Sequence, residues 1–222
     1  MKISHLLFDI DNTLYSGEAP INKNITRRMI LFAENFLNVS YDEAIRLRKE
    51  KLPVYGSTLN WLRKEYNFTD TEFFFNTVHP AEEEKELIPD PDLRQFLQTL
   101  NLPMTILTNA PGIHAMRVLN FYGIADLFES IHDIETCGLT GKPYESAFRA
   151  ALDKFGHKLD ETLFMDDSRG YVKGFSAIGG KAVLVTDELK LPESAYGVED
   201  GIFAKIRSVY DMPLLLERCK SL

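Results

Sequence analysis

Cysteine and long apolar runs are both scarce in this chain, and each absence excludes a class of protein. The 222 residues include only two cysteines, Cys137 and Cys219. Two isolated cysteines form neither a disulfide framework nor a paired-cysteine metal site, so we expect a reducing, cytoplasmic compartment. No apolar run approaches the roughly 18 residues of a membrane helix, and the first strand-like segment starts too early for a signal peptide. We therefore expect no membrane partner.

Positive charge is also in deficit. Lys and Arg total 25 against 33 Asp and Glu, which gives a net charge of -8. Proteins that bind nucleic acid through its phosphate backbone are usually basic, so no nucleic-acid partner is expected. A local site for a small anion can still be positive in an acidic protein. The five histidines are scattered, and none is predicted to be a metal ligand or a catalytic base.

The apolar pattern divides the chain into a first strand, a helical region and an alternating region. Residues 2–10 are almost continuously apolar, which predicts a buried strand. Residues 15–88 show apolar residues at helical spacing, with expected helix breaks at Pro53 and Gly56. From Asp90, which is expected to begin a helix, helical and strand patterns alternate. The later strands are predicted near residues 104–107, 130–134, 163–165 and 182–185.

This alternation is typical of a parallel sheet with helices on both faces. The predicted fold class is therefore α/β: a doubly wound, Rossmann-like parallel sheet formed by residues 1–14 and 89–222. Residues 15–88 are predicted to be a helical insertion after the first strand. Ligands of such sheets bind at the carboxyl ends of the strands, so we expect the functional site there.

Polar side chains occur where several predicted strands end. Asp9 and Asp11 follow an apolar run; either one alone could be a helix cap or a turn residue. Other polar residues recur at or beyond later strand ends, so all could line one crevice. The predicted set is Asp9, Asp11, Thr108, Asn109, Lys142, Asp166 and Asp167.

The charges of this set predict a metal and a phosphate. Four carboxylates in one cleft repel each other, so the site requires the positive charge of Lys142 and a bound cation. Oxygen ligands without clustered His or Cys favour a hard ion such as Mg²⁺. Lysine and metal together suit a phosphate dianion. Thr108, Asn109 and the loop that follows them are predicted to donate hydrogen bonds to it.

The order of these segments resembles the four motifs of the haloacid dehalogenase-like superfamily. The matching stretches are Phe8–Thr13, Leu107–Asn109, Lys142–Pro143 and Phe164–Ser168. The resemblance implies that Asp9 is a nucleophile that forms an aspartyl-phosphate. It also implies that the residue two positions later, Asp11, acts first as general acid and then as general base. A carboxylate at that position favours phosphoryl transfer over dehalogenation, because a leaving oxygen must be protonated.

The same resemblance implies a set of metal ligands. Mg²⁺ is expected to bind a side-chain oxygen of Asp9, the backbone carbonyl of Asp11 and the side chain of Asp167. Asp166 is expected either to bind the metal, directly or through water, or to hold Lys142 in place.

Residues 15–88 occupy the position of a small helical cap in this superfamily. The stretches Tyr55–Leu59, Leu107–Ala110 and Gly123–Phe128 are similar to the pyrimidine 5′-nucleotidase branch, which implies nucleoside monophosphate substrates such as UMP and CMP. Tyr55, at a break in the helical pattern, is predicted to contact the substrate, whereas the other cap aromatics are interpreted as core. A sugar-phosphate phosphatase or phosphomutase is an alternative. A non-catalytic phospho-ligand sensor is another, which the intact set of charged residues disfavours.

Overall fold

The computed structural model describes residues 2–186, 196–199 and 201–221, and the chain forms two compact units. The core unit comprises Met1–Glu18 and Ile88–Leu222, and the helical unit comprises Ala19–Leu87. The core unit extends past the expected boundary at residue 15, because Leu14 and Tyr15 are buried and the Tyr15 hydroxyl bonds to Asp11. Among the described residues, no helix combines the length and apolar composition needed to cross a membrane.

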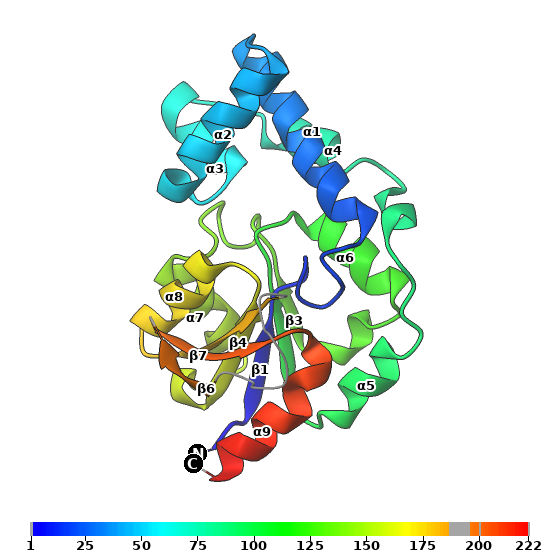
Figure 1. The fold of residues 1–222 in the computed structure, drawn as a ribbon, viewed down its shortest axis with the longest axis vertical. Helices are drawn as coiled ribbons and strands as arrows, with labels where there is room; N and C mark the ends of the chain where they lie inside the picture. Colours follow the sequence, from blue (N-terminus) through cyan, green and yellow to red (C-terminus); the bar gives the residue numbers. More distant parts are fainter. Residues whose placement is uncertain (1, 187–195, 200, 222) are drawn as a thin grey trace. The chain divides into compact units, whose positions relative to one another are not determined.

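The core unit is built on one sheet whose described strands have the order β3-β2-β1-β4-β5-β7-β6 (Figure 1). Neighbouring strands are parallel, except that β6 runs antiparallel to β7 at one edge. The strands are β1 His5–Phe8, β2 Met104–Leu107, β3 Ser130–His132, β4 Thr162–Asp166, β5 Lys181–Val185, β6 Tyr196–Glu199 and β7 Ile202–Ile206. The predicted α/β class with a parallel sheet is therefore confirmed, and β6 and β7 are additions that the apolar pattern did not predict.

Helices cover the sheet, which explains why its central strands are apolar throughout. Every residue of β1 and β4 is buried. Figure 1 shows α7 and α8 on one side of the sheet and α5 and α9 on the other. The core helices are α5 Leu93–Thr99, α6 Gly112–Phe121, α7 Glu145–Asp153, α8 Arg169–Ala177 and α9 Met212–Ser221.

Three phenylalanines connect the helices α7 and α8 to the central sheet. Phe148 on α7 lies 5.3 Å, between ring centroids, from Phe164 on β4 and 5.1 Å from Phe175 on α8. All three are fully buried. Aromatic pairs at such distances add to the large apolar area that they bury, so this cluster fixes β4 beneath its helices.

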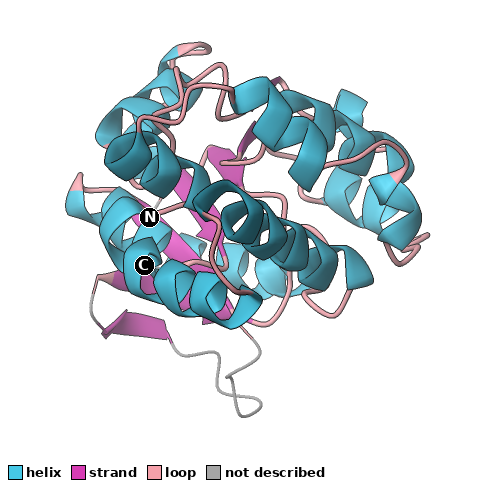
Figure 2. Cartoon of the chain, turned by 90° about the horizontal axis from the view of Figure 1, so that it is seen from above, coloured by secondary structure: helices cyan, strands magenta, loops and turns pink. Residues whose placement is uncertain are grey.

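The helical unit contains helices and turns, and the described strands all belong to the core unit (Figure 2). Ser40, Ser57 and Asp70 cap the starts of its second, third and fourth helices by accepting a backbone N–H bond. Phe32 packs against Phe68 and Phe74 in the interior. The helices are α1 Pro20–Leu37, α2 Tyr41–Tyr55, α3 Thr58–Tyr66 and α4 Thr71–Val78, followed by one 3-10 turn, Glu83–Glu86.

Two helix ends differ from the sequence-based expectation. Helix α2 continues through Pro53 to Tyr55, because a proline in the last turn removes only one intrahelical hydrogen bond. The helix ends at Gly56, whose positive φ of 76° lets its N–H bond to the Leu52 carbonyl. Helix α5 begins at Leu93 rather than Asp90, since the Asp90 side chain accepts the Asp92 N–H and forms a turn first.

Candidate active site

The carboxyl ends of three adjacent strands bring the predicted site residues to one edge of the sheet. Strand β1 pairs with β2 and β4, so that Phe8 lies beside Ile106 and Met165. Asp9 directly follows β1, and its N–H bonds to the Met165 carbonyl at 3.0 Å. Thr108 directly follows β2, and Asp166 is the last residue of β4. Parallel pairing alone therefore explains why these side chains meet.

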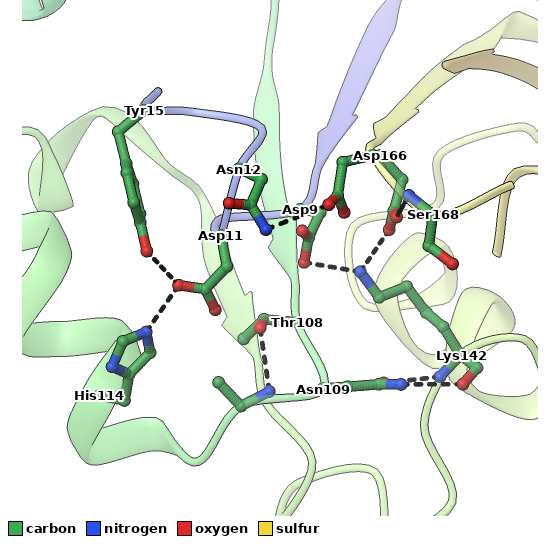
Figure 3. Close-up of polar contacts among 12 residues, drawn as sticks. Asp9, Asp11, Asn12, Tyr15, Thr108, Asn109, His114, Lys142, Asp166 and Ser168 are labelled. Carbon is green, nitrogen blue, oxygen red and sulfur yellow. Dashed lines mark hydrogen bonds and ion pairs between the residues drawn. The ribbon is translucent and has the colours of Figure 1, made fainter. Parts of the chain in front are cut away.

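A lysine–aspartate cluster forms the centre of the site (Figure 3). Lys142 Nζ lies 2.7 Å from Asp9 Oδ1 and 2.6 Å from Asp166 Oδ2. The Lys142 side chain is 1% exposed, and Asp166 is fully buried. The Lys142 ammonium also lies 5.1 Å from the centre of the Tyr171 ring, an additional cation–π contact. The attraction between the ammonium and the two carboxylates offsets the free-energy cost of removing these charges from water.

Burial and mutual repulsion shift the pKa values of this cluster. Burial alone would lower the pKa of Lys142, but the Asp166 and Asp9 carboxylates outweigh it and hold that pKa above its ordinary value. Burial raises the pKa values of Asp9 and Asp166, and their carboxylate neighbours raise them further, although Lys142 opposes the shift. Burial followed by the charge of Asp9 raises the pKa of Asp167 to about 6. The site thus favours additional positive charge.

Asp11 has different partners from Asp9. Its Oδ1 accepts a hydrogen bond from the Tyr15 hydroxyl and lies 2.9 Å from His114 Nε2. Figure 3 shows the Asp11 carboxyl group between Tyr15 and His114, whereas the Asp9 carboxyl points toward Lys142. Burial and then the charge of Asp11 raise the pKa of Tyr15, so the phenol stays protonated and donates. Two aspartates separated by one residue therefore have distinct environments.

The Asn109 side chain holds the loop that carries Lys142. Asn109 Nδ2 donates to the Lys142 carbonyl at 2.9 Å, and the Lys142 N–H donates to Asn109 Oδ1 at 2.8 Å. A Cβ at Gly141 would lie 2.0 Å from Asn109 Oδ1, so this close approach requires glycine. Thr108 Oγ1 accepts the Ala110 N–H at 3.0 Å, which shapes the loop after β2. The Asn109 side chain thus bonds to the backbone of Lys142, and its contact with phosphate stays a prediction.

Asp166 and Asp167 occupy the end of β4 with separate contacts. Asp166 Oδ1 accepts the Ser168 N–H at 2.8 Å, and Asp167 Oδ2 accepts a bond from Asn12 Nδ2 at 3.1 Å. Asp9, Asp166 and Asp167 each offer one carboxylate oxygen, and these three oxygens lie within 4.8 Å of one another. Such a group of hard oxygen donors can hold a divalent cation.

A pocket of about 600 Å³ lies within the core unit beside Asp167. Its lining includes Asn12, Tyr15, Arg207 and Tyr210. The volume falls within the range of small-molecule sites. Tyr55 belongs to the helical unit, where its hydroxyl donates to Glu65 Oε1 at 3.0 Å, and its contact with substrate stays a prediction.

His114 is the functional candidate that sequence reasoning missed. None of the five histidines was predicted to be a ligand or a base, and that prediction did not single out His114, which is fully buried and lies against Asp11. A usable signal was present, because His114 lies in the first turn of α6, just beyond the loop that follows β2. That loop was already expected at the edge of the sheet that carries the site.

Comparison with known proteins gives matches over most of the chain. The model of the haloacid dehalogenase-like hydrolase family matches residues 3–179. The chain is 28% identical to glyceraldehyde 3-phosphate phosphatase from Methanocaldococcus jannaschii, over 74% of this chain and 76% of that protein. It is 25% identical to phosphate metabolism protein 8 from Saccharomyces cerevisiae, over 95% of this chain and 71% of that protein.

Solved structures show the same fold. A HAD phosphatase from Thermococcus onnurineus superposes with a TM-score of 0.62 at 21% identity, covering 97% of this chain and 98% of that one. The HAD-hydrolase YfnB from Bacillus subtilis, bound to magnesium, also gives a TM-score of 0.62 at 18% identity, covering 98% and 100%.

Proposed function

Because the chain belongs to the haloacid dehalogenase-like hydrolase family, we propose that it is a phosphomonoesterase that forms an aspartyl-phosphate on Asp9. The observation that carries the proposal is the different environment of two nearby aspartates. Asp9 contacts the Lys142 ammonium, which favours an ionised nucleophile. Asp11 contacts Tyr15 and His114 instead, which suits a carboxyl group that exchanges a proton.

The donor set fits a divalent cation. Three carboxylates are gathered around one lysine, and their raised pKa values reflect negative charge that a cation would compensate. We assign the metal to Asp9, Asp167 and the backbone carbonyl of Asp11, and we assign Asp166 to holding Lys142. When bound, Mg²⁺ supplies positive charge that stabilises the transferring phosphoryl group.

The residues of the site divide the reaction into two steps. In the first, Asp9 attacks phosphorus, Asp11 protonates the departing alcohol oxygen, and Lys142 stabilises charge on the phosphoryl oxygens. In the second, Asp11 removes a proton from water as the water attacks the phosphorus on Asp9, and inorganic phosphate leaves. Thr108, whose oxygen already accepts a backbone N–H, can donate its hydroxyl hydrogen to a phosphoryl oxygen.

The substrate is proposed to be a small phosphorylated metabolite, with nucleoside 5′-monophosphates such as UMP and CMP as the first candidates. The support is the similarity of the Tyr55–Leu59 and Gly123–Phe128 stretches to the pyrimidine 5′-nucleotidase branch. The helical unit, residues 19–87, is proposed to act as the cap that selects substrate, with Tyr55 in contact with it. The similarity to glyceraldehyde 3-phosphate phosphatase from Methanocaldococcus jannaschii makes a triose phosphate the second candidate. The two isolated cysteines favour a cytoplasmic location.

A phosphate-release panel tests this function. The purified chain is assayed with UMP, CMP, glyceraldehyde 3-phosphate and hexose phosphates, with Mg²⁺ and again with a chelator. Asp9→Asn, whose side chain is close in size to aspartate, is the control and is expected to be inactive. If the wild type releases no phosphate from any compound, the phosphatase proposal is wrong. If sugar phosphates exceed UMP and CMP in kcat/KM, only the nucleotide assignment fails. A chelator that leaves activity intact would exclude the metal.

A further inference from the structure

Two side chains from separate segments hold one oxygen of Asp11. The Tyr15 hydroxyl donates to Asp11 Oδ1 from the same loop, and His114 Nε2 approaches that atom to 2.9 Å from the first turn of α6. Both partners are themselves confined. His114 is fully buried, and the Tyr15 ring stacks on Tyr122 with 6.0 Å between centroids. The two donors are therefore fixed in position before any substrate binds.

This double contact determines the orientation of the Asp11 carboxyl group. A carboxylate accepts hydrogen bonds only, so both Tyr15 and His114 donate to Oδ1. The terminal torsion of an aspartate is broad and nearly two-fold, so without such partners either oxygen could face the substrate. An oxygen that already accepts two hydrogen bonds is the poorer carrier of a proton. The transferable proton is therefore carried by Oδ2.

We propose that His114 and Tyr15 are positioning residues for acid–base transfer, because they orient Asp11 so that Oδ2 exchanges the proton. This inference rests on the proposed phosphatase function. In the first step the phosphorus–oxygen bond breaks, its electron pair goes to the leaving oxygen, and that oxygen takes the proton from Oδ2. In the second step Oδ2 takes a proton from the attacking water, while the electron pair of the broken bond returns to Asp9. Neither His114 nor Tyr15 contacts the phosphoryl group in this assignment.

The dependence of the rate on the leaving group separates positioning from general damage. An alkyl phosphate, such as glycerol phosphate, releases a poor leaving group that needs the proton, whereas p-nitrophenolate leaves without it. Because kcat/KM reports the first irreversible step, it is insensitive to the later attack by water. His114→Leu and Tyr15→Phe are each expected to lower kcat/KM for the alkyl phosphate by about ten- to a hundredfold. For p-nitrophenyl phosphate the expected loss is less than about threefold, because the proton contributes little there.

A conservative variant and two matched controls complete the design. In His114→Gln the amide nitrogen takes the place of Nε2, so most of the alkyl-phosphate activity should return. Tyr122→Phe removes the hydroxyl that bonds to the Ile88 carbonyl but keeps the ring that stacks on Tyr15. His132→Gln alters a buried histidine that contacts Ser130 Oγ. Neither control should change the ratio of the two kcat/KM values, and thermal melting verifies that each variant folds.

The outcomes distinguish this inference from the function on which it rests. A wild type inactive on both substrates overturns the phosphatase proposal before any variant is made. Asp11→Asn provides the reference pattern, a selective loss on the alkyl phosphate. If Asp11→Asn shows that pattern while His114→Leu and Tyr15→Phe lose both activities equally, or lose neither, positioning is refuted and the function stands. Should His114→Leu fail to fold, Tyr15→Phe decides the question by the same ratio.

Discussion

Lowering the pH from 7 to 5 is expected to destabilise the core unit through His5, which lies at the opposite end of β1 from Asp9. His5 is fully buried, and its ring stacks on His157 with 3.7 Å between centroids. Its Nδ1 lies 3.1 Å from Thr162 Oγ1, and its Nε2 lies 2.9 Å from Thr105 Oγ1. Because the Thr162 hydroxyl donates to the Lys158 carbonyl, it accepts from His5 Nδ1. The site is thus built for a neutral imidazole whose Nε2 is an acceptor.

The magnitude follows from the pKa of this histidine. Burial, and then the charge of His157, lowers the pKa of His5 from 6.5 to about 3. Between these values the unfolded chain binds more protons than the folded one, so stability rises with pH and is lost as pH falls. At pH 7, keeping His5 neutral in the folded state lowers the free energy of unfolding only slightly. At pH 5 this loss of stability amounts to about 2 kcal/mol, because the imidazole of the unfolded chain is then largely protonated.

Urea unfolding of the wild type and His5→Gln at pH 7, 6 and 5 measures this effect. Far-UV circular dichroism is the suitable probe, since the single tryptophan, Trp61, lies in the helical unit. His5→Gln cannot gain the proton, so the wild type should lose about 2 kcal/mol more than the variant between pH 7 and pH 5. Equal losses in the two proteins would refute the reasoning, whatever their stabilities at pH 7.

Three further substitutions test the site and the core. Lys142→Met leaves the buried Asp9 and Asp166 without their counter-charge, so it should lower the free energy of unfolding by about 3–5 kcal/mol. Thermal melts should show a larger loss of stability at pH 8, where both aspartates are charged, than at pH 5. A loss of stability that is independent of pH would contradict this. Gly141→Ala should lower kcat/KM by about tenfold or more, because the new Cβ would displace the Asn109 side chain. Gly170→Ala is the control and should leave kcat/KM unchanged, because its Cβ would lie at an ordinary 3.7 Å from Ser168 Oγ. Phe148→Ala should cost about 3–5 kcal/mol in chemical denaturation, against about 0.5 kcal/mol for the half-exposed Phe155→Ala.

The sequence predicted the features of the fold that depend on local pattern. The nearly continuous apolar character of residues 2–10 and 163–165 predicted buried strands, and the strands found there, β1 and β4, lie at the centre of the parallel sheet. Strand β7 was not predicted, because its alternating burial over Ile202–Ile206 gives a weaker signal next to a region rich in polar residues. The expected strand at 130–134 ends at His132.

The parts of the site that depend on contacts between distant residues were harder to predict from the sequence. Polar residues at strand ends could be recognised one by one, and parallel pairing explained their convergence. Whether Asp166 holds Lys142 could not be decided from the sequence, since their contact requires the exact position of a loop. The bond between His114 and Asp11 spans 103 positions and depends on the rotational phase of α6. A single sequence does not specify that phase.

The central position of β1 has a consequence for how the chain is made. This strand is synthesised before both of its native neighbours, residues 104–107 and 162–166, and His5 pairs with Thr162. Its four residues, all buried in the finished sheet, thus lack one neighbour until residue 107 and the other until residue 166 has been translated. Long-range pairing of this kind slows folding and exposes an apolar segment that can aggregate. Strand β1, which leads into Asp9, is therefore an apolar segment that stays open to aggregation until residues 162–166 have been made.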